Sequence, residues 1–250
     1  MRSVKYFDRA LSGLLAIALF VAFAPTQVVA QDNDRTYIQV RTAHVKGGMF
    51  DEWVALQKQL TEAMKADGRP GRTIWQEIRG DLGTFHTVTS LDNFGANDEP
   101  FDPPMDEDAW AEWVAAITNA THSSTRTILR THPEWSTAPD SDAEPNLLYL
   151  RYRTVGQGQM GAYHDWVKNS LSPALKEGGA DVTFSHVTLG GNNRTWISAT
   201  SLENWAAMDG EGPLSHMSNN AIDGMLDAAN NMVVESENRL LRYRADLSYQ

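Results

Sequence analysis

The sequence of 250 residues contains no cysteine. Disulfides, thiolate nucleophiles, cysteine-ligated zinc and cysteine-ligated iron–sulfur clusters are therefore excluded. Basic residues are also scarce, since 21 Lys and Arg stand against 32 Asp and Glu and give a net charge of −11. A chain this acidic lacks the positive surface that nucleic acids and anionic membranes attract. We expect neither of them as a partner.

Several catalytic motifs are absent as well. The sequence has no G-x-S-x-G, no P-loop and no dinucleotide fingerprint, which argues against a serine hydrolase of that type, an NTPase and a Rossmann dehydrogenase. Its seven histidines are scattered and none forms HExxH, so no metal site is predicted. No cofactor is expected either. Haem is the one exception considered, because it needs a single axial histidine, for which His164 or His216 is available.

Long hydrophobic runs are missing except near the N-terminus. There a cationic head precedes an apolar run over residues 10–24, and small residues then suit cleavage before Gln31. The run is shorter than the roughly 20 residues that a membrane-spanning helix needs. We predict a signal peptide over residues 1–30, a periplasmic or secreted mature protein, and no membrane association of the mature form.

What the sequence does contain is an internal repeat. The stretches TVTSLDNF (87–94) and SATSLENW (198–205) are nearly identical, and the segments around them follow in the same order. Each copy has a β-rich segment, an amphipathic helix, a hairpin with a glycine-bearing turn, a second helix and a last strand. This is the split βαβ order of a ferredoxin-like unit. We predict a first ferredoxin-like repeat over residues 36–136, a linker over 137–146 and a second repeat over 147–249.

Each repeat needs the other to bury its sheet. A ferredoxin-like sheet carries helices on one face only, and its other face requires a cover. The second repeat supplies that cover. The predicted fold is therefore α+β, with two tandem ferredoxin-like βαββαβ units that form an intramolecular α/β barrel, preceded by the signal peptide.

The openings of the two repeats, VRTAHVKGGMFDEW and YRTVGQGQMGAYHDW, and the motifs TSLDNF and TSLENW carry a family resemblance. They make the chain similar to the dimeric α/β-barrel superfamily, which includes antibiotic-biosynthesis monooxygenases, polyketide cyclases, stress-responsive barrel proteins and haem-binding relatives. The resemblance covers Thr36 to Tyr249 as two fused copies. It implies a barrel made within one polypeptide and does not specify a reaction.

Alternation along the strands separates the residues of the two sheet faces. In the first strand of each repeat we assign the aliphatic residues to the helix-facing core, namely Ile38, Val40, Leu148 and Leu150. The polar residues of these strands, with Trp75 of a later strand, then form a predicted ligand site between the sheets, made of Gln39, Arg41, Tyr149, Arg151, Arg153 and Trp75. We expect Arg41 and Arg153 to hold matching places in the two repeats, and Glu77 to match His186.

Buried arginines admit two explanations. Glu77 and neighbouring carbonyls would pair with Arg41 and Arg153 in a structural network, or the arginines would bind an anionic or carbonyl-bearing ligand. If the protein is an enzyme, His186 is the candidate acid or base that titrates near neutrality, and Glu77 is the carboxylate that orients it. His86 is a weaker candidate, because its strand face depends on the register.

These features lead to one main functional prediction and two alternatives. The main prediction is an exported small-molecule-binding or accessory protein. The first alternative is a cofactor-independent monooxygenase- or cyclase-like enzyme on a carbonyl-bearing or aromatic small molecule, in which the arginines, Glu77 and His186 polarise and deprotonate the substrate. The second is a structural assembly module without a ligand. The sequence leaves homo-oligomerisation open.

Overall fold

The computed structural model of the chain describes residues 36–98, 102–137, 146–210 and 212–249. They belong to one compact unit, Asp34–Gln250. The predicted signal peptide over residues 1–30 and most of the predicted linker over residues 137–146 lie outside the described residues. Of the helices in the described ranges, none is both long and apolar enough to cross a membrane.

Both repeats follow the predicted order of elements. The first repeat consists of β1 (Thr36–Val45), α1 (Phe50–Ala66), β2 (Thr73–Arg79), β3 (Thr84–Leu91), the 3₁₀ turn η1 (Phe94–Asn97), α2 (Glu107–Ala120) and β4 (Thr121–Thr131). The second consists of β5 (Leu147–Val155), α3 (Met160–Trp166), the π-helical η2 (Val167–Leu171), α4 (Ser172–Glu177), β6 (Val182–Leu189), β7 (Thr195–Leu202), the 3₁₀ turn η3 (Trp205–Met208), α5 (Asn219–Asn230) and β8 (Val233–Tyr243). The fold class is α+β, as predicted.

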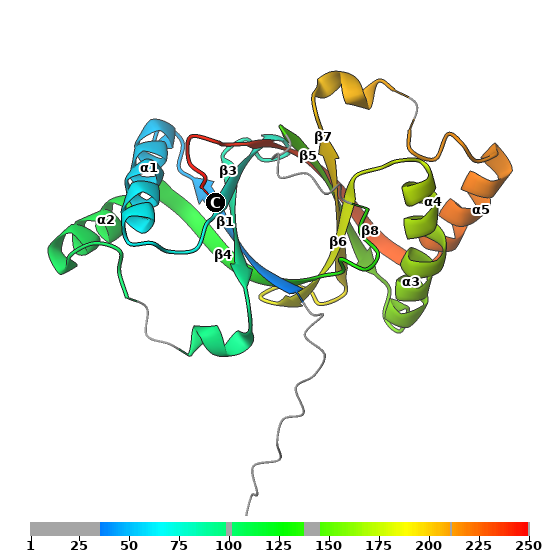
Figure 1. The fold of residues 1–250 in the computed structure, drawn as a ribbon, viewed down its shortest axis with the longest axis horizontal. Coiled ribbons are helices and arrows are strands. Elements are labelled where there is room, and N and C mark those ends of the chain that lie inside the picture. The colour runs from blue at the N-terminus through cyan, green and yellow to red at the C-terminus, as the bar shows by residue number, and fades with distance from the viewer. Residues whose placement is uncertain (1–35, 99–101, 138–145, 211, 250) are drawn as a thin grey trace, which may run out of the picture. The chain divides into compact units, whose positions relative to one another are not determined.

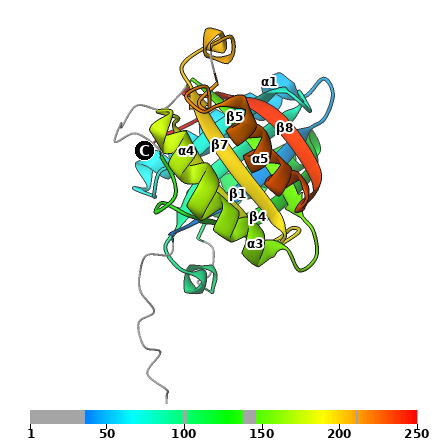
Figure 2. The ribbon, with the colours of Figure 1, turned by 90° about the vertical axis from the view of Figure 1, so that its right-hand side faces the viewer.

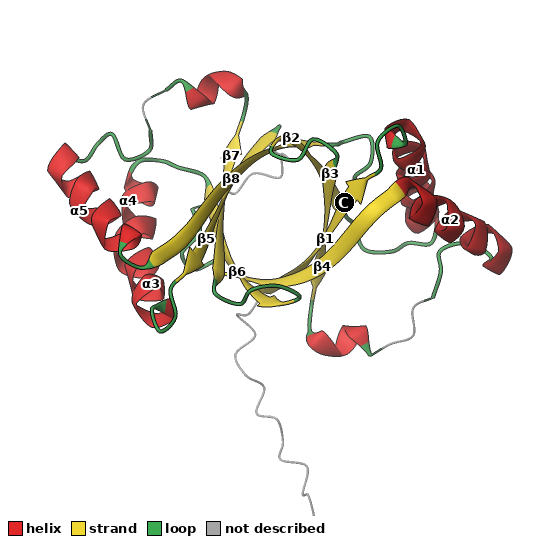
Figure 3. Ribbon diagram, turned by 180° about the vertical axis from the view of Figure 1, so that it is seen from behind, coloured by secondary structure: helices red, strands yellow, loops and turns green. Residues whose placement is uncertain are grey.

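The strands close into one antiparallel barrel in the order β1-β3-β2-β8-β5-β7-β6-β4. Two seams join the repeats, because β2 pairs with β8 and β4 pairs with β6. Figure 1 looks down the barrel, and Figure 3 shows the same ring of strands from behind. The helices lie outside the ring, with α1 and α2 on the first repeat and α3, α4 and α5 on the second. The repeated motif TSLDNF/TSLENW ends β3 and β7 and leads into the turns η1 and η3.

The helix expected after β5 is interrupted. α3 and α4 are joined by η2 and run as one rod beside the sheet of the second repeat (Figure 2). Pro173 lies at the start of α4 and has no backbone N–H to donate to the preceding turn. This missing donor accounts for the wider π-helical spacing.

Apolar side chains gather in three clusters. Two lie between a sheet and its helices, one around Trp53 and Phe85 in the first repeat and one around Tyr163 and Trp196 in the second. The third cluster, which includes Leu150, lies inside the barrel. The rings of Trp53 and Phe85 stack with centroids 4.2 Å apart. Both faces of each sheet are therefore covered.

The assignment of strand faces from the sequence is wrong. Ile38 and Val40, which we expected to face the helices, line the barrel interior together with Leu148 and Leu150. The alternate polar residues, among them Arg41, lie on the helix-facing side. Because both faces of the sheet are covered, alternation shows which residues share a face but not which face is inside the barrel.

The C-terminal segment of the second repeat completes the core of the first. Leu247 is fully buried in the cluster of the first repeat, and Thr61 of α1 donates a hydrogen bond to its carbonyl oxygen at 2.9 Å. Tyr249 and Arg72 exchange backbone hydrogen bonds at 2.8 and 2.9 Å. The two repeats are therefore interlocked beyond the two seams.

The turn after β6 packs against the seam between β4 and β6. Gly190 has a φ of +80°, a conformation that favours glycine. A Cβ atom at this position would overlap the backbone carbonyl of Arg126 on β4. The close approach of the two backbones thus requires glycine here.

We expect Gly190→Ala to lower the free energy of unfolding by about 3 kcal/mol, because the methyl group would push β4 and β6 apart in addition to the backbone strain. Gly158→Ala is the matched control. Its φ is +78°, but nothing lies within 4 Å of the added Cβ, so it should cost only about 1 kcal/mol. Urea unfolding followed by circular dichroism measures both changes. Equal losses would contradict the packing described for this turn.

Candidate functional site

Three cavities concern function. The second-repeat cavity, about 500 Å³, lies between β5, β7 and the helices α4 and α5. The first-repeat cavity, about 510 Å³, lies between β1, β4 and the helices α1 and α2. The barrel cavity, about 360 Å³, lies inside the ring of strands. Arg151, Arg153 and Leu226 line the second-repeat cavity. Arg41, Arg126 and Trp110 line the first-repeat cavity. Val40, Tyr152 and Arg239 line the barrel cavity.

The six predicted ligand residues do not form one site. The second-repeat cavity is lined by Tyr149, Arg151 and Arg153. The first-repeat cavity contains Arg41, which also lines a smaller adjoining pocket with Gln39. Trp75 lies in the barrel cavity. The predicted single site between the sheets is therefore divided among spaces on both faces.

Strand alternation builds the second-repeat cavity. Arg151 and Arg153 are two residues apart on β5, so their side chains lie on the same face of the sheet. β7 adds Ser198 and Thr200 by the same rule. The helices and their flanks contribute an aliphatic wall that includes Leu171, Leu175, Ile222 and Leu226. The cavity is thus apolar with two guanidinium groups on its sheet side.

Among the described residues, no carboxylate lines the wall of this positively charged cavity. Arg153 Nη1 lies 3.4 Å from the Tyr163 hydroxyl, and its guanidinium lies 5.7 Å from the Trp166 ring centroid. Arg151 lies 5.6 Å from the ring centroid of Tyr149. Hydroxyl and ring contacts hold the arginines in place and leave their charge available to an anion.

The predicted structural network of Glu77 with Arg41 and Arg153 is not formed. Glu77 pairs with Arg239 instead, at 2.7 Å. The explanation that Glu77 neutralises Arg41 and Arg153 in a structural network is therefore wrong.

The two repeats place one arginine at equivalent positions. Thr87 and Ser198 correspond in the repeated motif, Arg41 lies opposite Thr87, and Arg151 lies opposite Ser198. Arg41 therefore matches Arg151, and the predicted match with Arg153 is wrong by two residues.

The first-repeat cavity is lined by three arginines, Arg41, Arg69 and Arg126. Arg41 pairs with Arg126 across β1 and β4, and its Nε donates to the Ser124 hydroxyl at 3.1 Å. Burial, and then the charge of Arg126, lower the pKa of Arg41. Trp110 and Trp113, stacked with centroids 5.1 Å apart, form part of the opposite wall. Both cavities under the helices thus combine arginine with apolar surface.

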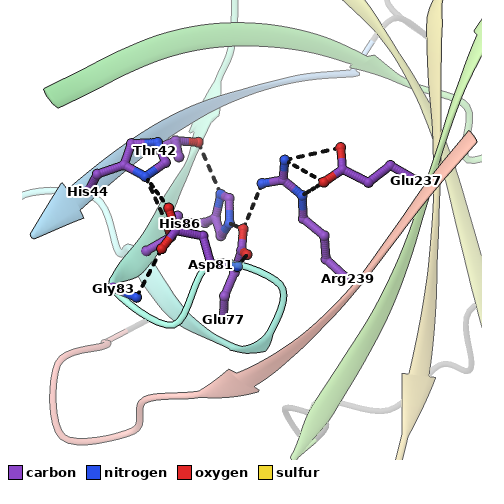
Figure 4. A network of polar contacts seen from close by, with 9 residues as sticks. Thr42, His44, Glu77, Asp81, Gly83, His86, Glu237 and Arg239 are labelled. Carbon is purple, nitrogen blue, oxygen red and sulfur yellow. Dashed lines mark hydrogen bonds and ion pairs between the residues drawn. The ribbon is translucent and has the colours of Figure 1, made fainter. Parts of the chain in front are cut away.

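Glu77 is fully buried at the centre of a polar network (Figure 4). Its Oε1 accepts hydrogen bonds from Arg239 Nη1 at 2.7 Å and His86 Nε2 at 2.8 Å, and its Oε2 accepts from the backbone N–H of Asp81 at 2.9 Å. The Thr42 hydroxyl donates to His86 Nδ1 at 3.0 Å. Burial opposes ionisation, but the hydrogen bonds from His86 and Asp81 and the charge of Arg239 outweigh it and lower the pKa of Glu77.

Arg239 is the member of this network that sequence reasoning missed. It lies on β8, 162 positions from Glu77, and its Nε donates to Glu237 Oε1 at 3.0 Å. Its guanidinium lies 5.1 Å from the ring centroid of Tyr152. No local sequence signal marks this arginine, because only the pairing of β2 with β8 brings it to Glu77.

The network lies at one of the two seams only, where β2 of the first repeat pairs with β8 of the second. The strand registers give its counterparts at the opposite seam, which are Val187 for Glu77, Ile197 for His86 and Thr127 for Arg239. The expected match of Glu77 with His186 is therefore wrong. By the same registers, the residue of the first repeat that corresponds to His186 is Gln76. The repeats share an architecture but differ in polarity inside the barrel.

His186 lies away from Glu77, in an aromatic cluster on the helix side. Its Nδ1 is 2.8 Å from His132 Nε2, and His132 Nδ1 is 3.2 Å from Glu134. Because a carboxylate accepts, His132 carries its proton on Nδ1, and its Nε2 accepts from His186. Burial, and then the charges of His132 and Arg130, lower the pKa of His186 to about 4. The predicted acid–base pair of His186 and Glu77 is not formed.

No family model matches the sequence, and no curated protein matches it. Solved structures do match. A putative monooxygenase from Fusobacterium nucleatum has 13% identity and a TM-score of 0.57, with 86% of this chain and 98% of that chain covered. An anthrone oxidase-like protein has 10% identity and a TM-score of 0.59, with 84% and 92% covered. A putative monooxygenase from Lactobacillus acidophilus has 12% identity and a TM-score of 0.54, with 84% and 94% covered.

The chain has the dimeric α/β-barrel fold. The superfamily resemblance seen in the sequence is confirmed at the level of this fold. At 10–13% identity, the matches establish the barrel fold and do not establish a reaction. Any proposal about function must therefore be argued from the residues that line the cavities.

The expectation that no cofactor is involved is wrong for this fold. Its matches include a putative chlorite dismutase, with 13% identity, a TM-score of 0.50 and 85% and 96% of the two chains covered. Haem is therefore among the ligands to be tested against this barrel.

The described residues do not fit a haem held by histidine in the second-repeat cavity. No histidine is among the described residues that line it. His164 packs edge-on against Trp135 with its side chain 43% exposed, and His216 lies 3.7 Å from Glu177. Over the described ranges, no group of three His, Asp or Glu side chains forms a metal site. We derive no step that depends on haem.

Acidification should destabilise the barrel through His186. The pKa of an unfolded histidine is about 6.5, whereas that of His186 is about 4. Between these values the unfolded chain binds more protons than the folded one, so the free energy of unfolding should fall by roughly 2 kcal/mol as the pH drops through this window. His186→Asn should flatten the decline, whereas His122→Asn, at an exposed position of β4, should not. Urea unfolding at several pH values measures both, and an unchanged slope in His186→Asn would contradict the assignment.

Proposed function

We propose that the protein binds a small, partly apolar molecule with an anionic oxygen, and that the second-repeat cavity is the binding site. The main support is the pair Arg151 and Arg153 in an apolar cavity whose described lining contains no carboxylate. Arg151 and Arg153 are partly buried, and two half-buried guanidinium groups with no acidic partner among the described lining residues favour a negatively charged guest. Guanidinium forks match carboxylate and enolate oxygens well.

The cavity is better equipped for binding than for proton transfer. Its described lining has two cations and the hydroxyls of Tyr149, Ser198, Thr200 and Ser215, but neither a carboxylate nor an imidazole. It can therefore stabilise negative charge on a ligand oxygen but offers no ordinary general base. A ligand that is already ionised suits this environment best.

An exported location is a further part of the proposal. Its support is the cationic head and apolar run over residues 1–30, together with a sequence free of cysteine.

Arg151→Ala should weaken the binding of 2-naphthoate, an aromatic anion, by about 10- to 100-fold, since a hydrogen bond to a charged group contributes about 1.5–3 kcal/mol. Arg242→Ala is the matched control, because it removes the same charge from an exposed position of β8 and should leave the affinity unchanged. Isothermal titration calorimetry measures the dissociation constants. Equal affinities of the parent protein and Arg151→Ala would count against this cavity.

The second candidate function is oxygenation of a ligand in the same cavity. Its support is the likeness to an anthrone oxidase-like protein and to putative monooxygenases. Anthrone would bind as its enolate, with the negative oxygen at Arg151 and Arg153. Dioxygen then converts the CH₂ group to C=O; one oxygen atom enters the product, and the other leaves as water with both hydrogens. The arginines would stabilise the enolate, which forms by loss of a proton to solvent.

Oxygen uptake tests this second candidate. With anthrone in air-saturated buffer, the protein should consume one dioxygen for each anthraquinone formed, and Arg151→Ala should slow this by about tenfold or more. Arg242→Ala should keep the full rate. Uptake no faster than in buffer alone would exclude oxygenation of this substrate and leave the binding proposal standing.

A further inference from the structure

We infer that the barrel cavity is a second ligand site, separate from the second-repeat cavity, and that it takes a small neutral apolar molecule with one hydroxyl or carbonyl group. This site lies on the other face of the sheet, and its argument does not depend on the function proposed above. Its volume of about 360 Å³ is at the lower end of the roughly 300–1,000 Å³ typical of small-molecule sites.

The surface of the cavity wall is mainly apolar. Both repeats contribute inward-facing side chains to it, among them Ile38, Val40, Leu129, Leu150, Ile197 and Leu241. Protein interiors are normally packed with few voids larger than a water molecule. A void of this size inside the barrel is therefore not explained by core packing, and its apolar wall would gain by burying an apolar guest.

The charges at the polar end of the cavity are already paired. Arg239 contacts both Glu77 and Glu237, and His86 is held between Glu77 and Thr42. Arg239, which lines the cavity, is therefore already neutralised by carboxylates, and an anionic guest would be buried without a compensating cation. A neutral guest avoids that cost, which distinguishes this site from the arginine cavity on the other face.

Tyr152 supplies the polar contact for such a guest. It lines the cavity, and its hydroxyl has no hydrogen-bond partner among the described residues. Burial raises its pKa to about 12, so the phenol stays protonated and can donate. A hydroxyl or carbonyl oxygen on the guest would accept a hydrogen bond from this phenol, and such a bond contributes about 0.5–1.5 kcal/mol.

The asymmetry of the barrel gives the site a direction. Glu77, His86 and Arg239 cluster at one seam, while the opposite seam has Val187, Ile197 and Thr127 at the matching places. A guest with one polar end and one apolar end would therefore bind in one orientation.

The test uses two probes with the same ring system, 2-acetylnaphthalene as the neutral ketone and 2-naphthoate as the anion. The variants are Ala199→Phe, which fills the barrel cavity, Tyr152→Phe, which removes only the hydroxyl, and Arg151→Ala, which alters the other cavity. The full protein is titrated with each probe and followed by tryptophan fluorescence. Thermal unfolding checks that each variant is folded.

We expect 2-acetylnaphthalene to bind the parent protein and Arg151→Ala equally, to bind Tyr152→Phe about fivefold more weakly, and not to bind Ala199→Phe. If Ala199→Phe does not fold, the Tyr152→Phe result decides. Three outcomes would overturn the inference: no binding of the ketone to the parent protein, affinity unaffected by Tyr152→Phe, or affinity lost in Arg151→Ala. The affinity for 2-naphthoate reports only on the second-repeat cavity. Its outcome therefore does not affect the conclusion drawn from 2-acetylnaphthalene.

Discussion

Pairing of the strand edges between the two repeats is the constraint on which the rest of the structure depends. Each repeat alone has a sheet with two open edges, and the seams of β2 with β8 and β4 with β6 close all of them. Closure removes the exposed edges that would otherwise recruit other chains. It also encloses the barrel cavity and brings Arg239 of the second repeat to Glu77 of the first. The central polar network is thus a product of closure and not of either repeat alone.

The duplication has kept one feature and changed another. On the helix side, Arg41 and Arg151 hold equivalent places, and each lies in a cavity with a second arginine and an apolar wall. Inside the barrel, the charged residues of one seam have apolar or hydroxyl-bearing counterparts at the other. The outward faces therefore remain alike, whereas the inward faces have diverged. Such a division allows one barrel to offer an anion-attracting environment and a nearly neutral one on opposite sides of the same strands.

The sequence alone was sufficient for the fold but not for the site. The repeated order of strands and helices, the turns and the mutual cover of the two sheets follow from local patterns, and the barrel has all of them. The strand faces could not be assigned, because Ile38 and Arg41 alternate in the same way whichever side is inside. Glu77 and Arg239 meet only through the register of a seam between distant strands. His186 forms a hydrogen bond with His132, which lies just beyond the end of β4. The pairing of β4 with β6 brings these two residues together, so the local sequence around His186 could not reveal its partner.

The C-terminal segment has a consequence for how the chain reaches its native form. Leu247 and Tyr249 complete the core around α1 and β2, which are synthesised early. A chain made from its N-terminus therefore carries an unfinished first repeat until Leu247 and Tyr249 have been synthesised. The first repeat can therefore complete its core only after the second repeat has been synthesised.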